Sequence, residues 1–187
     1  MTVVAHPFKP SAGARPGPPA KGAGAATSAV VIALADEAAT TALAARVAAV
    51  SRAGDAIALK GDLGTGKTAF ARAFIRKLGH THGIGDEDVP SPTFTLVQVY
   101  EYFPVRIWHF DLYRTRGPED VLELGLEEAL ADGIVLIEWA EHALPLLPPG
   151  HFLVELGYGE GEGARWARLS GGDWLARLDL RPDDEAH

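Results

Sequence analysis

The chain of 187 residues carries a formal charge of −8 at pH 7 and contains no cysteine, which excludes disulfide frameworks and thiolate metal sites. A chain without cysteine fits a reducing compartment, and we expect the cytoplasm. Residues 1–28 hold three cations and no carboxylate, which leaves a formal charge of −11 on residues 29–187. Such an acidic body argues against broad, non-specific nucleic-acid binding by this chain alone, but it leaves room for a basic pocket or for a partner that holds nucleic acid.

Two regions are expected along the chain. Residues 1–28 are rich in Ala, Gly and Pro and contain almost nothing large to bury, which predicts a flexible extension. Residues 29–187 are expected to form one globular domain. The longest apolar run near the start, residues 29–35, is too short to span a bilayer, so no membrane segment is predicted.

The folded region begins with VVIAL, a short β-branched strand, followed by Asp36 as the cap of a helix. Leu43, Val47 and Val50 follow at helical spacing, and the helix is predicted to run to about Arg52. AIALK (56–60) is predicted to be a buried strand, and a glycine-rich stretch follows it.

A second amphipathic helix is predicted after that stretch. Phe70, Phe74 and Leu78 recur every four residues, and Gly79 is expected to end the pattern. The cluster of Gly, Asp and Pro over residues 79–92 predicts a loop.

The remaining elements alternate between strands and helices. TLVQVYEYF and VRIWHFDLYR are predicted to be extended, with a turn at Pro104. Pro118 begins a helix with Leu122, Leu126 and Leu130 at spacing four, which Gly125 can break in two. IVLIEW is typical of a buried parallel strand; FLVELGY and ARWARLS predict a hairpin, and DWLARL a short terminal helix.

The stretch GDLGTGKT (61–68) matches the phosphate-binding pattern GxxxxGK[ST], with the expected strand before it and helix after it. Glycines let the backbone turn its N–H groups around an anion, and the helix that follows adds its positive end. Lys67 would reach the β and γ phosphates, and the Thr68 hydroxyl would ligate Mg²⁺. The predicted nucleotide-binding positions of the loop are Gly61, Gly64, Thr65, Gly66, Lys67, Thr68 and Ala69.

This motif predicts an α/β fold of the P-loop NTPase type, with a mainly parallel central sheet flanked by helices and an added antiparallel hairpin. A dinucleotide site is the weaker alternative: GTGKTA satisfies the looser GxGxxG/A fingerprint, with Asp86 to Asp88 about 20 residues on. In a dehydrogenase that acid ends a second buried strand, whereas GIGDEDVPSP is a polar loop.

Two acids end predicted strands. Glu138 could hold Mg²⁺ directly or through water, or it could be a solvated carboxylate at the sheet edge. Asp111, on the same strand face as His109, could orient the attacking water or bind the metal shell, or it could pair with Arg114 or Arg116. His109 is expected to be a hydrogen-bonded structural residue. The proline-stiffened loop VPSPTFT contains Thr93, which could sense the third phosphate, as could Ser91.

Five stretches carry a family resemblance: DEAAT (36–40), GDLGTGKT, SPTFTLV (91–97), HFDLYR (109–114) and IEW (137–139). In order and approximate spacing they resemble the bacterial TsaE family, P-loop ATPases of tRNA threonylcarbamoyladenosine synthesis. The likeness covers roughly Val30 to Leu180, and SPTFTLV together with HFDLYR is its most specific part.

The resemblance implies a cytoplasmic ATPase that binds ATP and Mg²⁺ and works with the TsaB and TsaD subunits, which would stimulate its turnover and handle the tRNA. It implies that Lys67, Asp111 and Glu138 are catalytic and that Thr68 and Glu138 hold the metal. Glu37 and Thr40 would lie near the adenine.

Ala69 departs from the family, because relatives often carry a second threonine at this position. Two alternatives remain: a small-molecule kinase, and a nucleotide-gated binding module without significant turnover. No arginine-bearing lid stands out between Gly79 and Pro92, and no NKxD motif indicates guanine.

Overall fold

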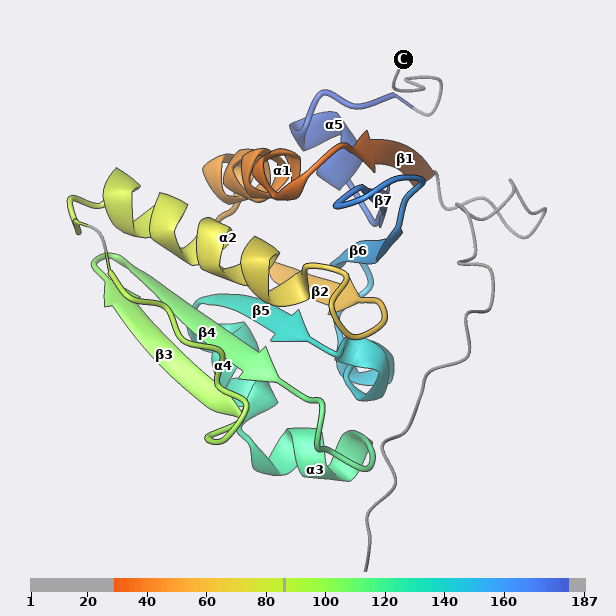
Figure 1. Ribbon diagram of the computed structural model, residues 1–187. Coiled ribbons are helices and arrows are strands. Elements are labelled where there is room, and N and C mark those ends of the chain that lie inside the picture. Colours follow the sequence, from red (N-terminus) through yellow and green to blue (C-terminus); the bar gives the residue numbers. More distant parts are fainter. Residues whose placement is uncertain (1–28, 86, 182–187) are drawn as a thin grey trace, which may run out of the picture.

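A computed structural model of the chain describes residues 29–85 and 87–181. The extension predicted over residues 1–28 lies outside the described residues. The described part is a mixed α/β structure with helices on both faces of one sheet (Figure 1). Among the helices of these residues, none is both long and apolar enough to cross a membrane.

The described residues form a seven-stranded sheet in the order β1-β7-β6-β2-β5-β4-β3. Four neighbouring strands, β6, β2, β5 and β4, run parallel; β3 pairs antiparallel with β4 at one edge, and at the other edge β7 pairs antiparallel with β6 and β1 pairs antiparallel with β7. The strands are β1 (Ala29–Leu34), β2 (Ala56–Lys60), β3 (Val97–Tyr102), β4 (Val105–Asp111), β5 (Ile134–Glu138), β6 (Phe152–Tyr158) and β7 (Arg165–Ser170). The parallel centre, the β6–β7 hairpin and the turn at Pro104 between β3 and β4 are confirmed, while the antiparallel pairing of β1 with β7 was not predicted.

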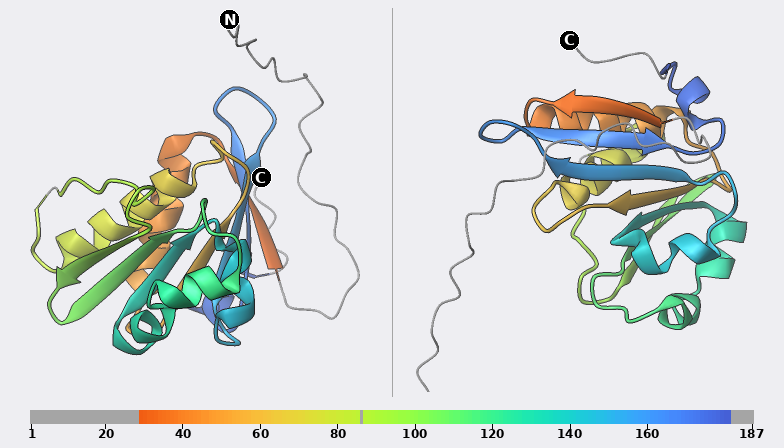
Figure 2. Two further views of the ribbon diagram at one scale, coloured as in Figure 1. Left: turned by 90° about the horizontal axis from the view of Figure 1, so that it is seen from below. Right: turned by 90° about the vertical axis from the view of Figure 1, so that its right-hand side faces the viewer.

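The helices divide between the two faces of the sheet (Figure 2). On one face lie α1 (Glu37–Val50), α2 (Lys67–Thr81) and α5 (Trp174–Arg177). On the other lie α3 (Pro118–Glu123), α4 (Leu126–Asp132) and the short 3₁₀ turns η1 (Ala140–His142) and η2 (Leu144–Leu146). Among the described residues this division gives two apolar cores, one on each face of the sheet.

Successive side chains along the central strands point alternately into the two cores. In β2, Ile57 and Leu59 face α1 and α2, while Ala56 and Ala58 face the opposite core. All of β5 is buried, as expected for a parallel strand covered on both faces. Because β2, β4 and β5 are parallel, their carboxyl ends reach the same edge of the sheet.

The first helix forms as predicted. The Asp36 carboxylate accepts a hydrogen bond from the Ala39 backbone N–H at 2.8 Å and so caps α1. Leu43 and Val47 are buried, and the helix ends at Val50, two residues before the predicted end.

The second helix corrects one expectation. Phe70, Phe74 and Leu78 are buried as predicted, but α2 continues through Gly79 to Thr81. Gly79 lies inside the helix and does not end it, and a Cβ there would be in ordinary van der Waals contact with the Tyr102 ring at 3.4 Å.

The predicted break at Gly125 is confirmed, because Gly125 caps α4 after α3 ends. The break changes which residues face the core. Val121 and Leu126 are buried, while Leu122, one of the predicted set, is exposed.

Candidate functional site

The glycine loop connects the end of β2 to the start of α2, so the predicted order of strand, loop and helix is confirmed. Gly61 has a φ of 137°, and a Cβ there would clash with the Leu156 carbonyl oxygen of β6. Gly64 has a φ of 77°, with the Tyr158 hydroxyl 2.9 Å from the place of a Cβ. A side chain at Gly61 would force the loop away from β6, and both glycines have a positive φ that other residues rarely adopt, which explains them.

Lys67 lies inside this loop and is only 4% exposed. Its Nζ donates hydrogen bonds to the backbone oxygens of Gly61 at 2.6 Å and Asp62 at 2.8 Å. It also lies 3.5 Å from the centroid of the Trp139 ring. Burial lowers the pKa of the Lys67 ammonium, and nearby carboxylates, Glu138 first among them, oppose that shift. A cation held in this way favours an anionic ligand, whose charge would stabilise its protonated form.

Glu138, at the end of β5, joins two elements of the site. The Thr68 hydroxyl donates to Glu138 Oε2 at 2.7 Å, and His109 Nε2 lies 3.0 Å from Glu138 Oε1. Glu138 is 1% exposed, so it is not a solvated sheet-edge carboxylate. His109 is fully buried and hydrogen-bonded, as predicted, and its contact with Glu138 fixes the orientation of that carboxylate.

Asp111 lies opposite Glu138 in the parallel register of β4 and β5 and is buried. Its Oδ2 accepts hydrogen bonds from the hydroxyls of Ser91 at 2.8 Å and Thr93 at 2.9 Å. Arg114 instead donates to a backbone oxygen, and within residues 29–85 and 87–181 the ion pairs do not include Asp111. Asp111 therefore ties the predicted phosphate-sensing loop to the sheet.

Glu37 and Thr40 lie at the start of α1, next to the glycine loop. Thr40 is buried, and Glu37 is exposed. They line a pocket of about 180 Å³ together with Gly64, Thr65, Gly66, Ala69, Gly163 and Arg165. The structure thus gathers the predicted positions at residues 37, 40 and 61–69 around one loop, while Thr93 is hydrogen-bonded to Asp111 at the end of β4.

Three residues at this site were missed by sequence reasoning. Trp139, with a φ of 56°, turns its ring over Lys67. The Tyr158 hydroxyl donates to the Leu63 carbonyl at 2.6 Å, and Arg165 Nη2 donates to the Gly64 carbonyl at 3.1 Å. Trp139 directly follows the strand-end acid, a position that could have drawn attention, whereas no local signal marks Tyr158 or Arg165.

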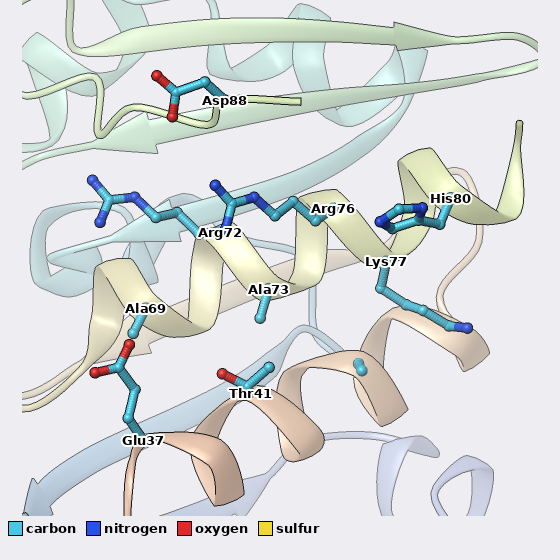
Figure 3. Close-up of a pocket in the computed structure, with 10 residues that line it drawn as sticks. Glu37, Thr41, Ala69, Arg72, Ala73, Arg76, Lys77, His80 and Asp88 are labelled. Atoms are coloured by element: carbon cyan, nitrogen blue, oxygen red, sulfur yellow. The ribbon is translucent and has the colours of Figure 1, made fainter. Parts of the chain in front are cut away.

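A groove of about 600 Å³ runs between α1 and α2 from Glu37 and Ala69 toward His80 (Figure 3). Arg72 and Arg76 extend toward the segment that carries Asp88. Their Nε atoms donate to the backbone oxygens of Val89 at 2.9 Å and Glu87 at 3.1 Å. These cations thus hold the 87–89 segment against α2, outside the glycine loop. That segment contains no strand among its described residues, which speaks against the dinucleotide alternative.

Two side chains beside the glycine loop, Thr68 and Glu138, are candidate ligands for a metal ion. Within the part of the chain that the structure describes, no three His, Asp or Glu side chains are grouped so that they could bind one. Thr68 and Glu138 nevertheless bring a hydroxyl and a carboxylate within 2.7 Å of each other beside the glycine loop. Mg²⁺ commonly takes one or two such ligands and completes its shell with phosphate and water oxygens.

The family model for Threonylcarbamoyl adenosine biosynthesis protein TsaE matches residues 34–165. The tRNA threonylcarbamoyladenosine biosynthesis protein TsaE of Rickettsia felis is 46% identical over 96 residues, which are 51% of this chain and 53% of that protein. The TsaE protein of Bacillus subtilis is 37% identical over 102 residues, 54% of this chain and 60% of that protein. The chain thus spans about half the length of the Rickettsia relative.

A solved structure is also similar. The crystal structure of YdiB from Bacillus subtilis superposes with a TM-score of 0.63 at 27% sequence identity, covering 81% of this chain and 91% of that chain. The similarity therefore extends to the fold. This chain belongs to the TsaE family.

Proposed function

We propose that this protein binds ATP with Mg²⁺ at residues 61–68 and hydrolyses it to support synthesis of N6-threonylcarbamoyladenosine in tRNA, together with TsaB and TsaD. The observation that carries the proposal is the hydrogen bond of 2.7 Å between Thr68 Oγ1 and Glu138 Oε2, beside a lysine buried inside the glycine loop. Membership of the TsaE family supports the link to the tRNA modification.

Thr68 and Glu138 are the residues that would hold Mg²⁺, because hydroxyl and carboxylate oxygens are ligands that this ion accepts. When bound, the ion would neutralise part of the charge on the phosphates. His109 limits the rotation of the Glu138 carboxylate, since its Nε2 lies 3.0 Å from Oε1. A fixed carboxylate needs little reorganisation when the ligand binds.

The glycine loop and Lys67 would bind the triphosphate. Backbone N–H groups of the loop and the start of α2 attract phosphate oxygens. Lys67 Nζ would exchange the carbonyls of Gly61 and Asp62 for phosphate oxygens and stabilise the negative charge that develops during hydrolysis.

Asp111 and Thr93 would position the water that attacks the γ-phosphate. Asp111 ends the strand next to Glu138, and it holds the Thr93 hydroxyl at 2.9 Å. A carboxylate in this position can accept a hydrogen bond from water and orient it in line with the breaking bond. Glu37 and Thr40 would contact the adenosine in the pocket beside the loop.

Lys67→Ala tests the proposal. We expect hydrolysis, measured as phosphate release in the presence of TsaB and TsaD, to fall by about 10³-fold, because removal of one stabilising group costs about that much. Lys77→Ala, on the same helix and outside the loop, is the matched control. Both variants should keep the melting temperature of the wild type. Unchanged hydrolysis in Lys67→Ala would overturn the proposed function.

A further inference from the structure

The hairpin of β6 and β7 lies directly against the glycine loop. β6 pairs in parallel with β2, with Lys60 opposite Glu155, so the loop that follows β2 continues along β6. Gly61 packs against the Leu156 backbone so closely that a side chain would not fit. The hairpin is therefore close enough to act on the loop, although about a hundred residues separate them in sequence.

Four consecutive carbonyl groups of the loop accept hydrogen bonds from side chains. Lys67 binds the carbonyls of Gly61 and Asp62 at 2.6 and 2.8 Å. The next two carbonyls, those of Leu63 and Gly64, are bound by Tyr158 at 2.6 Å and Arg165 at 3.1 Å. Two of these four carbonyls, those of Leu63 and Gly64, are therefore bound by side chains of the β6–β7 hairpin.

A bound phosphate would affect the hydrogen bonds from Lys67 differently from those of Tyr158 and Arg165. Lys67 would leave its carbonyls to reach the phosphate, because it is the cation inside the loop. Tyr158 and Arg165 bind from the hairpin side and would keep their bonds. A carbonyl held outward fixes the peptide plane, and the N–H group of the same peptide then points inward. Bonds from the hairpin would therefore hold the loop in its anion-binding conformation while Lys67 changes partners.

Arg165 has two further contacts. Its guanidinium carbon lies 4.6 Å from the centroid of the Tyr158 ring, so the two hairpin side chains support each other. Arg165 also lines the pocket of about 180 Å³ that contains Glu37 and Thr40. A planar guanidinium in such a wall can stack on a base or bind a ribose hydroxyl.

We propose that Tyr158 and Arg165 form a clamp that positions the glycine loop, and that Arg165 also contacts the nucleoside of the bound nucleotide. The second part rests on the proposed function. The clamp itself does not, because it is a property of the loop that can be measured without any nucleotide.

The experiment compares Tyr158→Phe, Arg165→Gln and Arg165→Lys with the wild-type full chain. Arg168→Gln, on the same strand and paired with Glu155, is the matched control. Amide hydrogen exchange of residues 61–66 is measured without ligand, and calorimetry gives the affinities for ATP and for tripolyphosphate, which has no nucleoside. Melting temperatures show that each variant is folded.

Loss of one hydrogen bond should weaken ligand binding by about 5-fold, so Tyr158→Phe should lose this factor for both ligands and exchange its loop amides faster. Arg165→Gln should lose more affinity for ATP than for tripolyphosphate. Arg165→Lys should recover tripolyphosphate binding, because lysine can still donate to Gly64, but it should not recover ATP binding. The control should match the wild type.

Wild-type exchange rates in both Tyr158→Phe and Arg165→Gln would overturn the clamp. Equal losses for ATP and tripolyphosphate in Arg165→Gln would overturn the nucleoside contact. A wild-type protein that binds neither ligand would instead contradict the proposed function, and the exchange rates would still decide whether the clamp exists.

Discussion

The two ends of β2 hold charged side chains in different ways. Before the strand, Asp55 forms two hydrogen bonds with Arg177, at 2.6 and 3.0 Å, and both side chains are 13% exposed. The hydrogen bond to Asp55 raises the pKa of Arg177, and the Arg177 guanidinium lies 4.0 Å from the Trp174 ring centroid. After the strand, Lys67 and Glu138 are more deeply buried; Lys67 donates to two backbone carbonyls, and Glu138 contacts the Thr68 hydroxyl and the His109 ring.

This difference separates a stabilising site from a binding site. A buried charge in a direct ion pair contributes to the fold or costs little, whereas a buried charge without a directly bonded opposite charge destabilises the folded chain. Proteins often keep such a destabilising buried charge at a binding or catalytic site, where a ligand or ion supplies the missing opposite charge. We therefore expect variants at the Asp55 end to change stability and variants at the Glu138 end to change activity.

Glu138→Gln should have the largest effect on activity. Gln can keep the hydrogen bonds to Thr68 and His109 but removes the negative charge, so we expect hydrolysis to fall by about 10³-fold while the fold is retained. Phosphate release under saturating ATP measures the loss, with Glu141→Gln as the control. A lower melting temperature together with normal hydrolysis would show that Glu138, like Asp55, stabilises the fold and does not take part in hydrolysis.

Arg177→Met should have the largest effect on stability. It leaves Asp55 without its partner, and we expect the free energy of unfolding to fall by about 3 kcal/mol. Urea denaturation measures this change, and ATP affinity should stay as in the wild type. Arg52→Met is the control: its pair with Asp173 is 69% and 59% exposed, so its removal should cost under about 1 kcal/mol. A larger effect in Arg52→Met than in Arg177→Met would contradict this account of the fold.

Asp111→Asn should reduce hydrolysis by about 10²-fold, the lower range for loss of a positioned base. The amide oxygen can still accept the hydroxyls of Ser91 and Thr93, so ATP binding should change little. Single-turnover kinetics separate the two quantities. A loss confined to ATP affinity would show that Asp111 orders the loop but does not act on the attacking water.

The sequence predicts those features of the site that are encoded within a few neighbouring residues, but not the contacts between residues far apart in the chain. The glycine loop, the Asp36 cap and the buried strand before Glu138 are each encoded within a few residues, and the structure has all three. The groups that hold the loop are not encoded in this way: Tyr158 lies 95 residues from Leu63, and Arg165 lies 101 from Gly64. Their contacts arise from the pairing of β6 with β2, which no periodicity reveals.

The roles of Gly79 and Asp55 also could not be predicted from the neighbouring sequence. A glycine at the end of an amphipathic pattern commonly ends a helix, but α2 continues past Gly79 to Thr81 and packs there against Tyr102, which comes from a strand 23 residues later in the chain. Asp55 precedes a strand in the same way that many turn residues do. Its role follows only from Arg177, 122 residues away.

The smallest effect concerns pH. Burial lowers the pKa of Lys67 from the ordinary lysine value of 10.5, so at any pH below that value a larger fraction of this side chain is neutral than in an exposed lysine. Phosphate binding favours the charged form, so ATP binding should take up protons as the pH approaches the lowered pKa, and the affinity should fall a few-fold at higher pH. Calorimetry in buffers of different ionisation enthalpy detects this uptake, which should be absent in Lys67→Met.

The most direct test of the central claim is a calorimetric titration of the wild-type protein with ATP, with Mg²⁺ and then with the ion chelated. We expect one ATP per chain, with higher affinity when Mg²⁺ is present, and loss of that magnesium dependence in Glu138→Gln. Absence of ATP binding, or a magnesium dependence that is the same in Glu138→Gln as in the wild type, would contradict the assignment of this loop and this acid to a nucleotide site.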